Sequence, residues 1–224
     1  FTSSTSGPNA GTDGNTSNDQ SSFTFSIVTS AATLPLVEGF QSAFPPSGWS
    51  LYNPNNDVAW ILNSTIGSNS SQSAQFDNCS QNVPNTQDQI RTTAFDFSSA
   101  TSAQMSFDVG YAPYDNQYSD TLAVYYSTNC GSAWTQIYSK GGTTLASVPC
   151  AMSNTVTCGT YSDGQGCFLP NVAAAWRNDV INLSAVLGQP SVMFAFENRS
   201  GYGSNLFLDN INITSVVGIH ETDI

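Results

Sequence analysis

The sequence predicts an all-β protein, namely a two-sheet antiparallel β-sandwich of the jelly-roll type with a short N-terminal β segment. Three observations indicate this fold. Apolar and polar residues alternate with period two in many short segments, and turns rich in Asn, Gly, Pro and Ser separate these segments. No long run shows the three- and four-residue spacing of an amphipathic helix. About ten short strands with such turns are typical of a sandwich.

The alternation is clearest in three segments. In residues 103–110, Met105, Phe107 and Val109 are expected to face the core, while Ser106 and Asp108 face the other way. Residues 120–127 and 191–198 repeat this pattern. Further strands are expected at the start of the chain and in residues 23–28, 48–53, 58–63, 73–77, 89–95, 133–139, 177–183 and 206–213.

Residues 1–30 differ from the rest of the chain, because a turn-rich run without large apolar residues precedes a single strand. We interpret them as the remnant of a preceding immunoglobulin-like domain or as an N-terminal arm. Residues 31–214 are expected to form one jelly-roll domain, and residues 215–224 a linker toward a further module. No run approaches the ~18 apolar residues of a membrane-spanning helix, so no membrane insertion is expected. The start of the chain is not a signal peptide, and we interpret the chain as a mature or excised piece of an exported protein.

Charge is scarce and strongly acidic. Only 9% of the residues are charged, and sixteen acids against four bases give a formal net charge of −12. Such a chain repels phosphate backbones and anionic membranes, so nucleic acid is excluded as a partner. Because few bases are present to pair with the acids, hard cations such as Ca²⁺ are plausible partners for some carboxylates.

The five cysteines indicate an oxidising location. Cys150, Cys158 and Cys167 cluster in a loop-like stretch, which favours local disulfide bridging, while Cys79 and Cys130 stand apart. None of them forms a CxxC pair, and the single histidine disfavours a zinc site of the usual spacing. The odd number leaves one thiol over, so the pairing stays open at this stage.

Catalysis is not expected. His220, the only histidine, lies in the C-terminal tail, so nucleophiles activated by histidine and the HExxH motif are excluded. A glycosidase needs only two carboxylates, but nothing in the sequence brings two of them to a catalytic separation. No motif for an organic cofactor occurs.

Acids in or beside predicted strands are candidate metal ligands. A carboxylate on a sheet face is costly to bury unless it is paired or binds a metal, and four bases cannot serve every acid. Calcium is therefore the expected cofactor. The alternative is that Asp108 and Asp209 simply lie on the solvent face of their strands. The candidate ligands are Glu38, Asp108, Asp120 and Asp209.

Aromatic residues are the second group of candidates, because their apolar ring faces suit the C–H faces of sugars. The tryptophans are expected in or near the core, and Tyr111 is considered together with the loop tyrosines as a stacking ring. Tyr114, Tyr118 and Tyr202 lie in turn-rich loops and are the expected ligand contacts.

Four stretches, residues 34–60, 95–114, 118–142 and 197–213, resemble in this order the MAM-like jelly-roll modules of secreted Bacteroidota proteins. These modules are related to the cleaved-adhesin domains of gingipains and to choice-of-anchor J domains. Residues 1–30 resemble the closing strands of a CARDB-type immunoglobulin-like domain. The segment SVVGIHETDI resembles the lead-in to a type IX secretion sorting domain.

The resemblance implies a calcium-stabilised sandwich on an exported, often surface-attached protein that acts as an adhesin or as an accessory to an enzyme. Modules of this kind open with an acidic stretch that supplies calcium ligands together with an aspartate of the closing strand. Glu38 and Asp209 match these positions, while Gly39 and Gln41 replace two acids. The resemblance also extends to two further aspartates of the family pattern, matched here by Asp108 and Asp120.

The sequence thus favours a non-catalytic adhesive or carbohydrate-binding module of a secreted, cell-surface protein, exported by the type IX machinery and stabilised by calcium. Its partner would be a glycan or a host or surface protein. Two alternatives remain: a structural spacer or filament subunit of the cell surface, and an accessory domain of a secreted metalloprotease or glycosidase.

Overall fold

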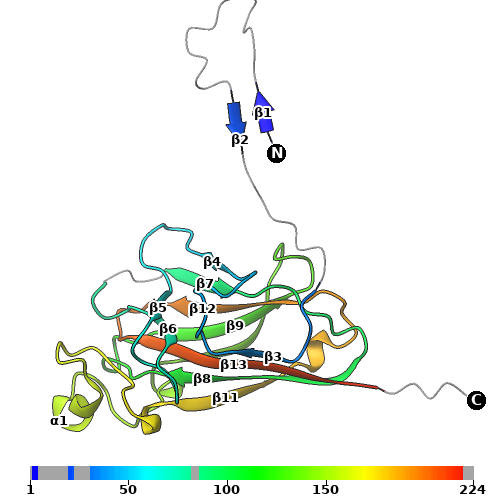
Figure 1. Ribbon diagram of the computed structural model, residues 1–224. Helices are drawn as coiled ribbons and strands as arrows, with labels where there is room; N and C mark the ends of the chain where they lie inside the picture. Colours follow the sequence, from blue (N-terminus) through cyan, green and yellow to red (C-terminus); the bar gives the residue numbers. More distant parts are fainter. Residues whose placement is uncertain (1, 5–19, 23–30, 82–85, 219–224) are drawn as a thin grey trace, which may run out of the picture.

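The computed structural model describes residues 2–4, 20–22, 31–81 and 86–218. Two antiparallel sheets pack face to face as a sandwich (Figure 1), which confirms the predicted fold class. At the start of the chain, β1 (Thr2–Ser4) pairs with β2 (Gln20–Ser22), as expected for a short N-terminal β segment. The strand expected at 23–28 lies outside the described residues. None of the described helices is long and apolar enough to cross a membrane.

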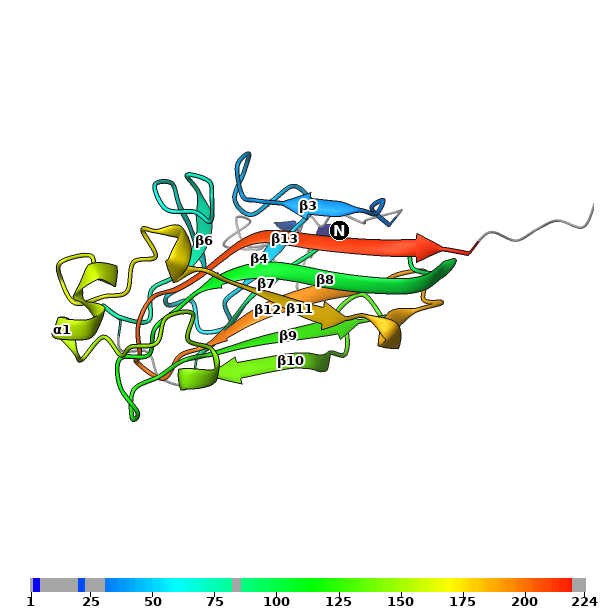
Figure 2. The same ribbon diagram turned by 90° about the horizontal axis from the view of Figure 1, so that it is seen from below.

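One sheet has six strands in the order β11–β8–β13–β6–β5, with β3 also paired to β13. Figure 2 shows β3 lying along β13, and β8 between β13 and β11. Strand β13 continues beyond residue 214, so residues 215–217 belong to the closing strand. The strands are β3 (Leu36–Glu38), β5 (Ile61–Asn63), β6 (Ser73–Phe76), β8 (Ala100–Gly110), β11 (Arg177–Asn182) and β13 (Leu206–Val217).

The other sheet has five strands in the order β10–β9–β12–β7–β4. Each strand pairs antiparallel with its neighbours, so residues directly opposite one another share a face of the sheet. The strands are β4 (Ser50–Tyr52), β7 (Gln87–Arg91), β9 (Thr121–Ser127), β10 (Thr135–Gly141) and β12 (Met193–Arg199).

The core between the sheets is rich in aromatic rings. Met105, Phe107 and Val109 are fully buried, as the alternation in β8 predicts. The rings of Phe107 and Phe196, one from each sheet, meet edge to face with centroids 5.6 Å apart. Trp60 is also fully buried and donates from Nε1 to the carbonyl oxygen of Asp88 at 3.0 Å.

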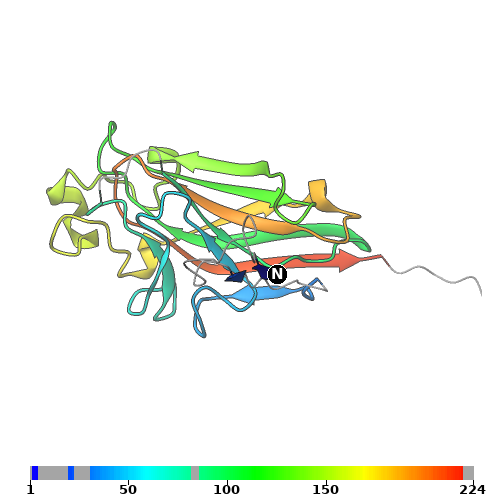
Figure 3. The ribbon, with the colours of Figure 1, turned by 90° about the horizontal axis from the view of Figure 1, so that it is seen from above.

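A long excursion between β10 and β11 covers the outer face of the six-stranded sheet at one end. It contains 3-10 turns and one short helix, and Figure 3 shows it at the end of the sandwich opposite to the end of β13. Phe207 packs under it in a second apolar cluster. The elements are η3 (Gly142–Thr144), α1 (Thr155–Cys158), η4 (Gly159–Tyr161) and η5 (Ala173–Ala175), and η6 (Ser184–Val186) follows β11.

Two disulfides secure this excursion. Cys150 and Cys158 form the local bridge that the clustering favours, and Cys167 is bound to Cys79, 88 residues earlier in the chain. Cys130 is the free, exposed thiol that the odd number requires. The excursion is therefore tied both to itself and to the strand exit after β6.

Candidate ligand-binding site

Three exposed tyrosines gather at the end of the sandwich that carries the excursion. Tyr114 and Tyr118 come from the β8–β9 loop, and Tyr202 comes from the β12–β13 loop. Each of these residues is about two-fifths exposed, at 41, 40 and 39% respectively. Together with Cys79 and Gly203 they line a pocket of about 310 Å³. The structure thus brings together the three tyrosines that the sequence suggested as ligand contacts.

The three rings form a cup. Tyr114 and Tyr118 have ring centroids 6.4 Å apart and planes inclined by 65°, while Tyr118 and Tyr202 lie 6.0 Å apart at 85°. Adjacent rings therefore turn by most of a right angle, which is the preferred edge-to-face arrangement of aromatic pairs. Such rings enclose a ligand from several sides, whereas coplanar rings would form a flat platform.

The loop that carries Tyr202 is held by the buried carboxylate of Asp120, at the entrance to β9. Its Oδ1 accepts from the backbone N–H groups of Gly201 at 2.8 Å and Gly203 at 3.1 Å, and its Oδ2 accepts from Ser204 N–H at 2.9 Å. Burial raises the pKa of Asp120, while these N–H groups oppose the shift. A single carboxylate thus fixes the backbone on both sides of Tyr202.

The glycines beside Tyr202 are required by close approach. A Cβ on Gly201 would collide with the backbone carbonyl of Ser119, and one on Gly203 with the carboxylate of Asp120. Tyr202 itself adopts φ 58°, in the left-handed region that few side chains favour. The two glycines therefore allow the loop backbone to pack closely against Ser119 and Asp120, while the ring of Tyr202 stays exposed to solvent.

Tyr111 has a structural role, so the interpretation of it as a stacking ring is wrong. Its side chain is fully buried, its hydroxyl donates to Asp120 Oδ2 at 3.2 Å, and the same hydroxyl accepts from Asp120 N–H at 2.7 Å. Burial, followed by the charge of Asp120, raises the pKa of Tyr111 well above its usual value. This ring stands behind the pocket and supports Asp120.

The other two tyrosines are positioned by their own loop and by the excursion. Asp115 Oδ1 accepts from the N–H groups of Gln117 and Tyr118, both at 2.7 Å, which closes a tight turn before Tyr118. The carbonyl oxygen of Tyr114 accepts from Ser153 N–H at 2.8 Å. The excursion therefore docks on the backbone of this loop.

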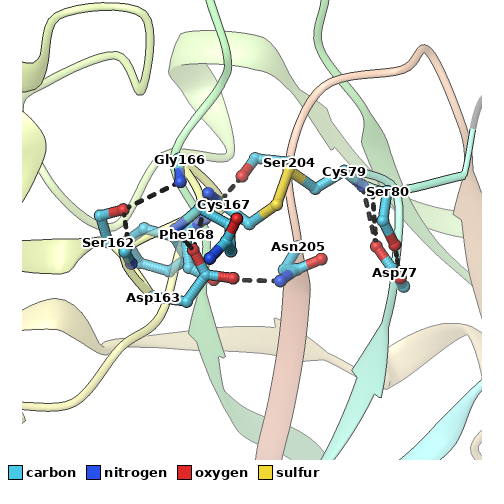
Figure 4. The surroundings of a disulfide bond; sticks show 12 residues. Asp77, Cys79, Ser80, Ser162, Asp163, Gly166, Cys167, Phe168, Ser204 and Asn205 are labelled. Carbon is cyan, nitrogen blue, oxygen red and sulfur yellow. Dashed lines mark hydrogen bonds between the residues drawn. A yellow bond between two sulfur atoms is a disulfide. The ribbon is translucent and has the colours of Figure 1, made fainter.

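The Cys79–Cys167 disulfide joins the β6 exit to the excursion (Figure 4). Cys79 also lines the tyrosine pocket. Asp77 Oδ1 accepts from Cys79 N–H at 3.1 Å, and Asp163 Oδ1 accepts from Cys167 N–H at 3.1 Å. Phe168 N–H, next in the chain, donates to Ser204 Oγ at 2.9 Å. The bridge thereby connects the β6 exit, the excursion and the Tyr202 loop.

A second polar cluster lies on the outer face of the six-stranded sheet. Asp209 and Asp108 are directly opposite in register on β13 and β8. Asp108 is partly exposed, but Asp209 is fully buried, because the turn at 68–70 covers it. Ser68 N–H and Ser70 Oγ donate to its Oδ2 at 2.8 and 3.0 Å, and Asn210 N–H donates to Oδ1 at 2.7 Å. Asp209 thus faces away from the core without reaching solvent.

Asp209 retains room for one more partner. A carboxylate offers about four lone-pair directions, and the three hydrogen bonds use both on Oδ2 but only one on Oδ1. Burial raises the pKa of Asp209, and the charge of Asp108 adds to the shift. A cation beside Oδ1 would relieve both effects.

The surroundings of Asp209 Oδ1 are rich in oxygen. A Cβ on Gly39 would lie 3.7 Å from this atom and 3.6 Å from Asn210 Oδ1. Glu38 pairs with Ile211 on the neighbouring strand, but its Oε1 accepts from Phe40 N–H. Within the described residues, no three acid, histidine or cysteine side chains come together as a preformed metal cluster. Any cation here would rely on backbone and amide oxygens in addition to the carboxylates.

Asp120 belongs to the tyrosine site rather than to the Asp209 cluster. Its two oxygens already accept four hydrogen bonds from three backbone N–H groups and the Tyr111 hydroxyl. The assignment as metal ligands therefore remains a prediction for Glu38, Asp108 and Asp209. Asp120 instead positions the Tyr202 loop through its hydrogen bonds.

Sequence reasoning missed three buried acids. Asp179 faces the core, where Tyr138, Lys140 and Arg177 donate to its carboxylate. Burial alone would raise the pKa of Asp179, but these donors lower it overall. Asp88 is also buried, and burial followed by the charge of Asp57 raises its pKa to about 6. The third acid, Glu197, lies on the outer face of the other sheet. Arg177 and Arg199 lie only two residues from Asp179 and Glu197, but no motif marks the three acids as buried, because their burial depends on packing between distant strands.

The comparisons with known proteins concern the fold. No protein-family model and no curated protein matches the sequence. Among solved structures, the K1 cleaved adhesin domain of Lys-gingipain from Porphyromonas gingivalis is 19% identical, with 82% of this chain and 99% of that chain covered and a TM-score of 0.57. The K3 domain is 18% identical, with 80% and 98% covered and a TM-score of 0.54. The K2 domain is 18% identical, with 82% and 98% covered and a TM-score of 0.52.

These matches show that the described sandwich has the fold of the cleaved adhesin domains of gingipain. Each of these domains is covered almost completely, so the likeness spans a whole domain. The expected structural relationship to cleaved-adhesin modules is therefore confirmed.

Proposed function

We propose that this protein is a non-catalytic adhesive module that binds glycans in the tyrosine pocket. The main observation behind this proposal is a pocket of about 310 Å³ that is lined by three exposed tyrosines, Tyr114, Tyr118 and Tyr202. The rigid backing of this pocket supports the proposal, because preorganised aromatic side chains bind with little loss of entropy. The likeness in fold to adhesin domains is consistent with such a role.

The ligand of this pocket is the end of a sugar chain. The rings are inclined to one another by 65° and 85°, so they can contact different faces of one sugar unit. A flat, extended polysaccharide lying along the surface would instead suit rings that share a plane. The pocket is therefore assigned to a terminal sugar of a glycan.

Changing Tyr118 to Ala is expected to weaken glycan binding by about tenfold or more, because its ring packs against the rings of both Tyr114 and Tyr202 at the centre of the pocket lining. Tyr114→Ala and Tyr202→Ala are expected to weaken it as well. Glycan-array screening followed by calorimetry measures these effects. Ile61→Ala is the control, since Ile61 is an exposed apolar residue at 51% that lies on β5, outside the pocket.

Two results would refute this assignment. Binding that survives all three substitutions would place the ligand elsewhere on the domain. Absence of binding to a broad glycan panel, combined with regular self-assembly of the purified chain, would instead favour a spacer or filament subunit of the cell surface.

The same proposal places the domain outside the cell, in a secreted or surface-attached protein that is exported by the type IX machinery. Two disulfides support an oxidising location. Calcium is assigned to Asp209 Oδ1 on β13, with Glu38, Asp108 and nearby amide and carbonyl oxygens as further ligands. When bound there, calcium would supply positive charge between the opening and closing strands of the domain.

Removal of calcium is expected to lower the melting temperature by about 2–4 °C for each kcal/mol of binding free energy lost. Asp209→Asn is expected to abolish this response to chelator, because the amide cannot supply the anionic ligand. Differential scanning calorimetry with and without chelator measures the effect. Asp96→Asn, at an exposed turn, is the control that should still respond. A wild-type melt indifferent to chelator would rule the calcium site out.

A further inference from the structure

The outer face of the five-stranded sheet carries a band of polar and aromatic side chains that differ from those of the tyrosine pocket. Residues in direct register share one face, and their neighbours Ile90, Phe196 and Val124 point into the core. Five strands spaced about 4.8 Å apart give this band a width of about 19 Å. One row consists of Ser50, Arg91, Ala195, Tyr125 and Gln136, and the next of Tyr52, Gln89, Glu197 and Ala123.

Arg91 lies near the β4 side of this band, between two aromatic rings. Its guanidinium carbon lies 3.8 Å from the ring centroid of Tyr52 and 5.2 Å from that of Trp134. Its Nε donates to Gln89 Oε1 at 2.6 Å, which fixes the plane of the group. Stacking and this hydrogen bond therefore hold the guanidinium in one orientation.

Among the residues that the structure describes, Arg91 is the base without an ion pair to an acid. Lys140 and Arg177 form ion pairs with Asp179, and Arg199 pairs with Glu197 at 2.8 Å. No acid among the described residues lies within ion-pair distance of Arg91. In a chain with four bases and sixteen acids, a partly buried arginine without a carboxylate is unexpected.

The nearest carboxylate in the band, Glu197, is held by groups other than Arg91. Glu197 is nearly buried, and its Oε1 accepts from Tyr125 at 3.1 Å and from Arg199 at 2.8 Å. Its Oε2 accepts from Gln89 Nε2 at 2.6 Å. Gln89 thereby links Glu197 to Arg91 while keeping the two charges apart, so Arg91 is positioned for a charge from outside.

We propose that this face is a second ligand site, in which Arg91 binds the carboxylate of an acidic sugar within a mainly neutral glycan chain. A planar guanidinium matches a carboxylate through two parallel hydrogen bonds. The ring of Tyr52, 41% exposed, offers a stacking surface beside it. Ser50, Tyr125 and Gln136 continue the row with neutral groups that suit sugar hydroxyls.

The charge of the whole protein selects among acidic ligands. A net charge of −12 repels densely charged chains, and Arg91 supplies only one uncompensated positive charge. A chain with widely spaced uronic acids meets both conditions. The neutral hydroxyl-binding groups and the exposed ring favour a sugar chain over an acidic peptide.

Calorimetry with matched probes tests this site. The test ligand is a β-linked oligosaccharide of neutral sugars with a single glucuronic acid residue. The control ligand is the same compound with the carboxyl group of that residue reduced to an alcohol. Wild-type protein is expected to bind the acidic form about tenfold or more tightly, with weakening at high salt. Arg91→Gln is expected to remove this preference, and Arg91→Lys to restore only part of it.

Matched variants separate this site from the tyrosine pocket. Tyr202→Ala should leave the preference for the acidic ligand intact, whereas Tyr52→Ala should weaken binding of both ligands at this face. Unchanged melting temperatures of the variants verify folding. Equal affinity of wild type for the two ligands, or a preference that survives Arg91→Gln, would overturn the proposal. Selective binding of an acidic peptide in place of the sugar would overturn the ligand class.

Discussion

Asp120→Ala is expected to destabilise the domain by about 3–5 kcal/mol and to abolish ligand binding in the tyrosine pocket. The change leaves three backbone N–H groups and the buried hydroxyl of Tyr111 without their acceptor. Each buried donor that loses its partner costs about 1–3 kcal/mol, partly offset by water that enters the site. The loop bearing Tyr202 would also lose the contact that fixes its backbone.

Urea unfolding measures the loss of stability, and calorimetry with the pocket's glycan measures the loss of binding. Asp120→Asn is the conservative companion, because its amide oxygen can still accept from part of the loop. We expect it to lose less stability than the alanine variant. Native stability and binding in Asp120→Ala would show that the Tyr202 loop is held by its packing rather than by this carboxylate.

Replacing both Cys79 and Cys167 by serine is expected to cost about 4–5 kcal/mol of unfolding free energy, since the bridge closes a loop of 88 residues. The pair Cys150 and Cys158 closes a loop of 8 residues and is expected to contribute about 2–3 kcal/mol by the same chain-entropy relation. The longer bridge also borders the pocket, so its removal should weaken ligand binding as well.

Chemical denaturation of the two double-serine variants, compared under identical conditions, checks this order. Cys130→Ser is the control, because this thiol is free and exposed, and its replacement should leave stability unchanged. A larger loss from the short bridge than from the long one would contradict the entropic explanation. It would show that local packing of the excursion dominates.

Much of the fold was predictable, because strand alternation is a local property. Met105, Phe107 and Val109 face the core as the period-two pattern requires. The local Cys150–Cys158 bridge also follows the clustering of cysteines in one loop. The long bridge from Cys79 to Cys167 could not be assigned, since it depends on how the β6 exit meets an excursion late in the chain.

The candidate site was predictable in its residue types but only partly in their roles. Tyr114, Tyr118 and Tyr202 were selected because rings in turn-rich loops are usually exposed, and they share one pocket. Tyr111, only three residues before Tyr114, is instead buried against Asp120. Its position directly after β8 aims it inward, and this distinction requires the strand boundary and the packing of a distant loop.

Sequence alone determined the all-β class, the acidic low-charge surface and the tyrosine-bearing loops, because composition and period-two patterning act within a few residues of the chain. Tertiary structure alone decided that Asp120 positions the Tyr202 loop, that Asp209 is covered by the turn at 68–70, and that Arg91 has no acidic partner within the described part of the chain. A carboxylate or guanidinium carries the same charge in any strand. Its role is set by which donors and acceptors the other strands bring within about 3 Å of it, and this depends on register and loop packing between segments far apart in the chain.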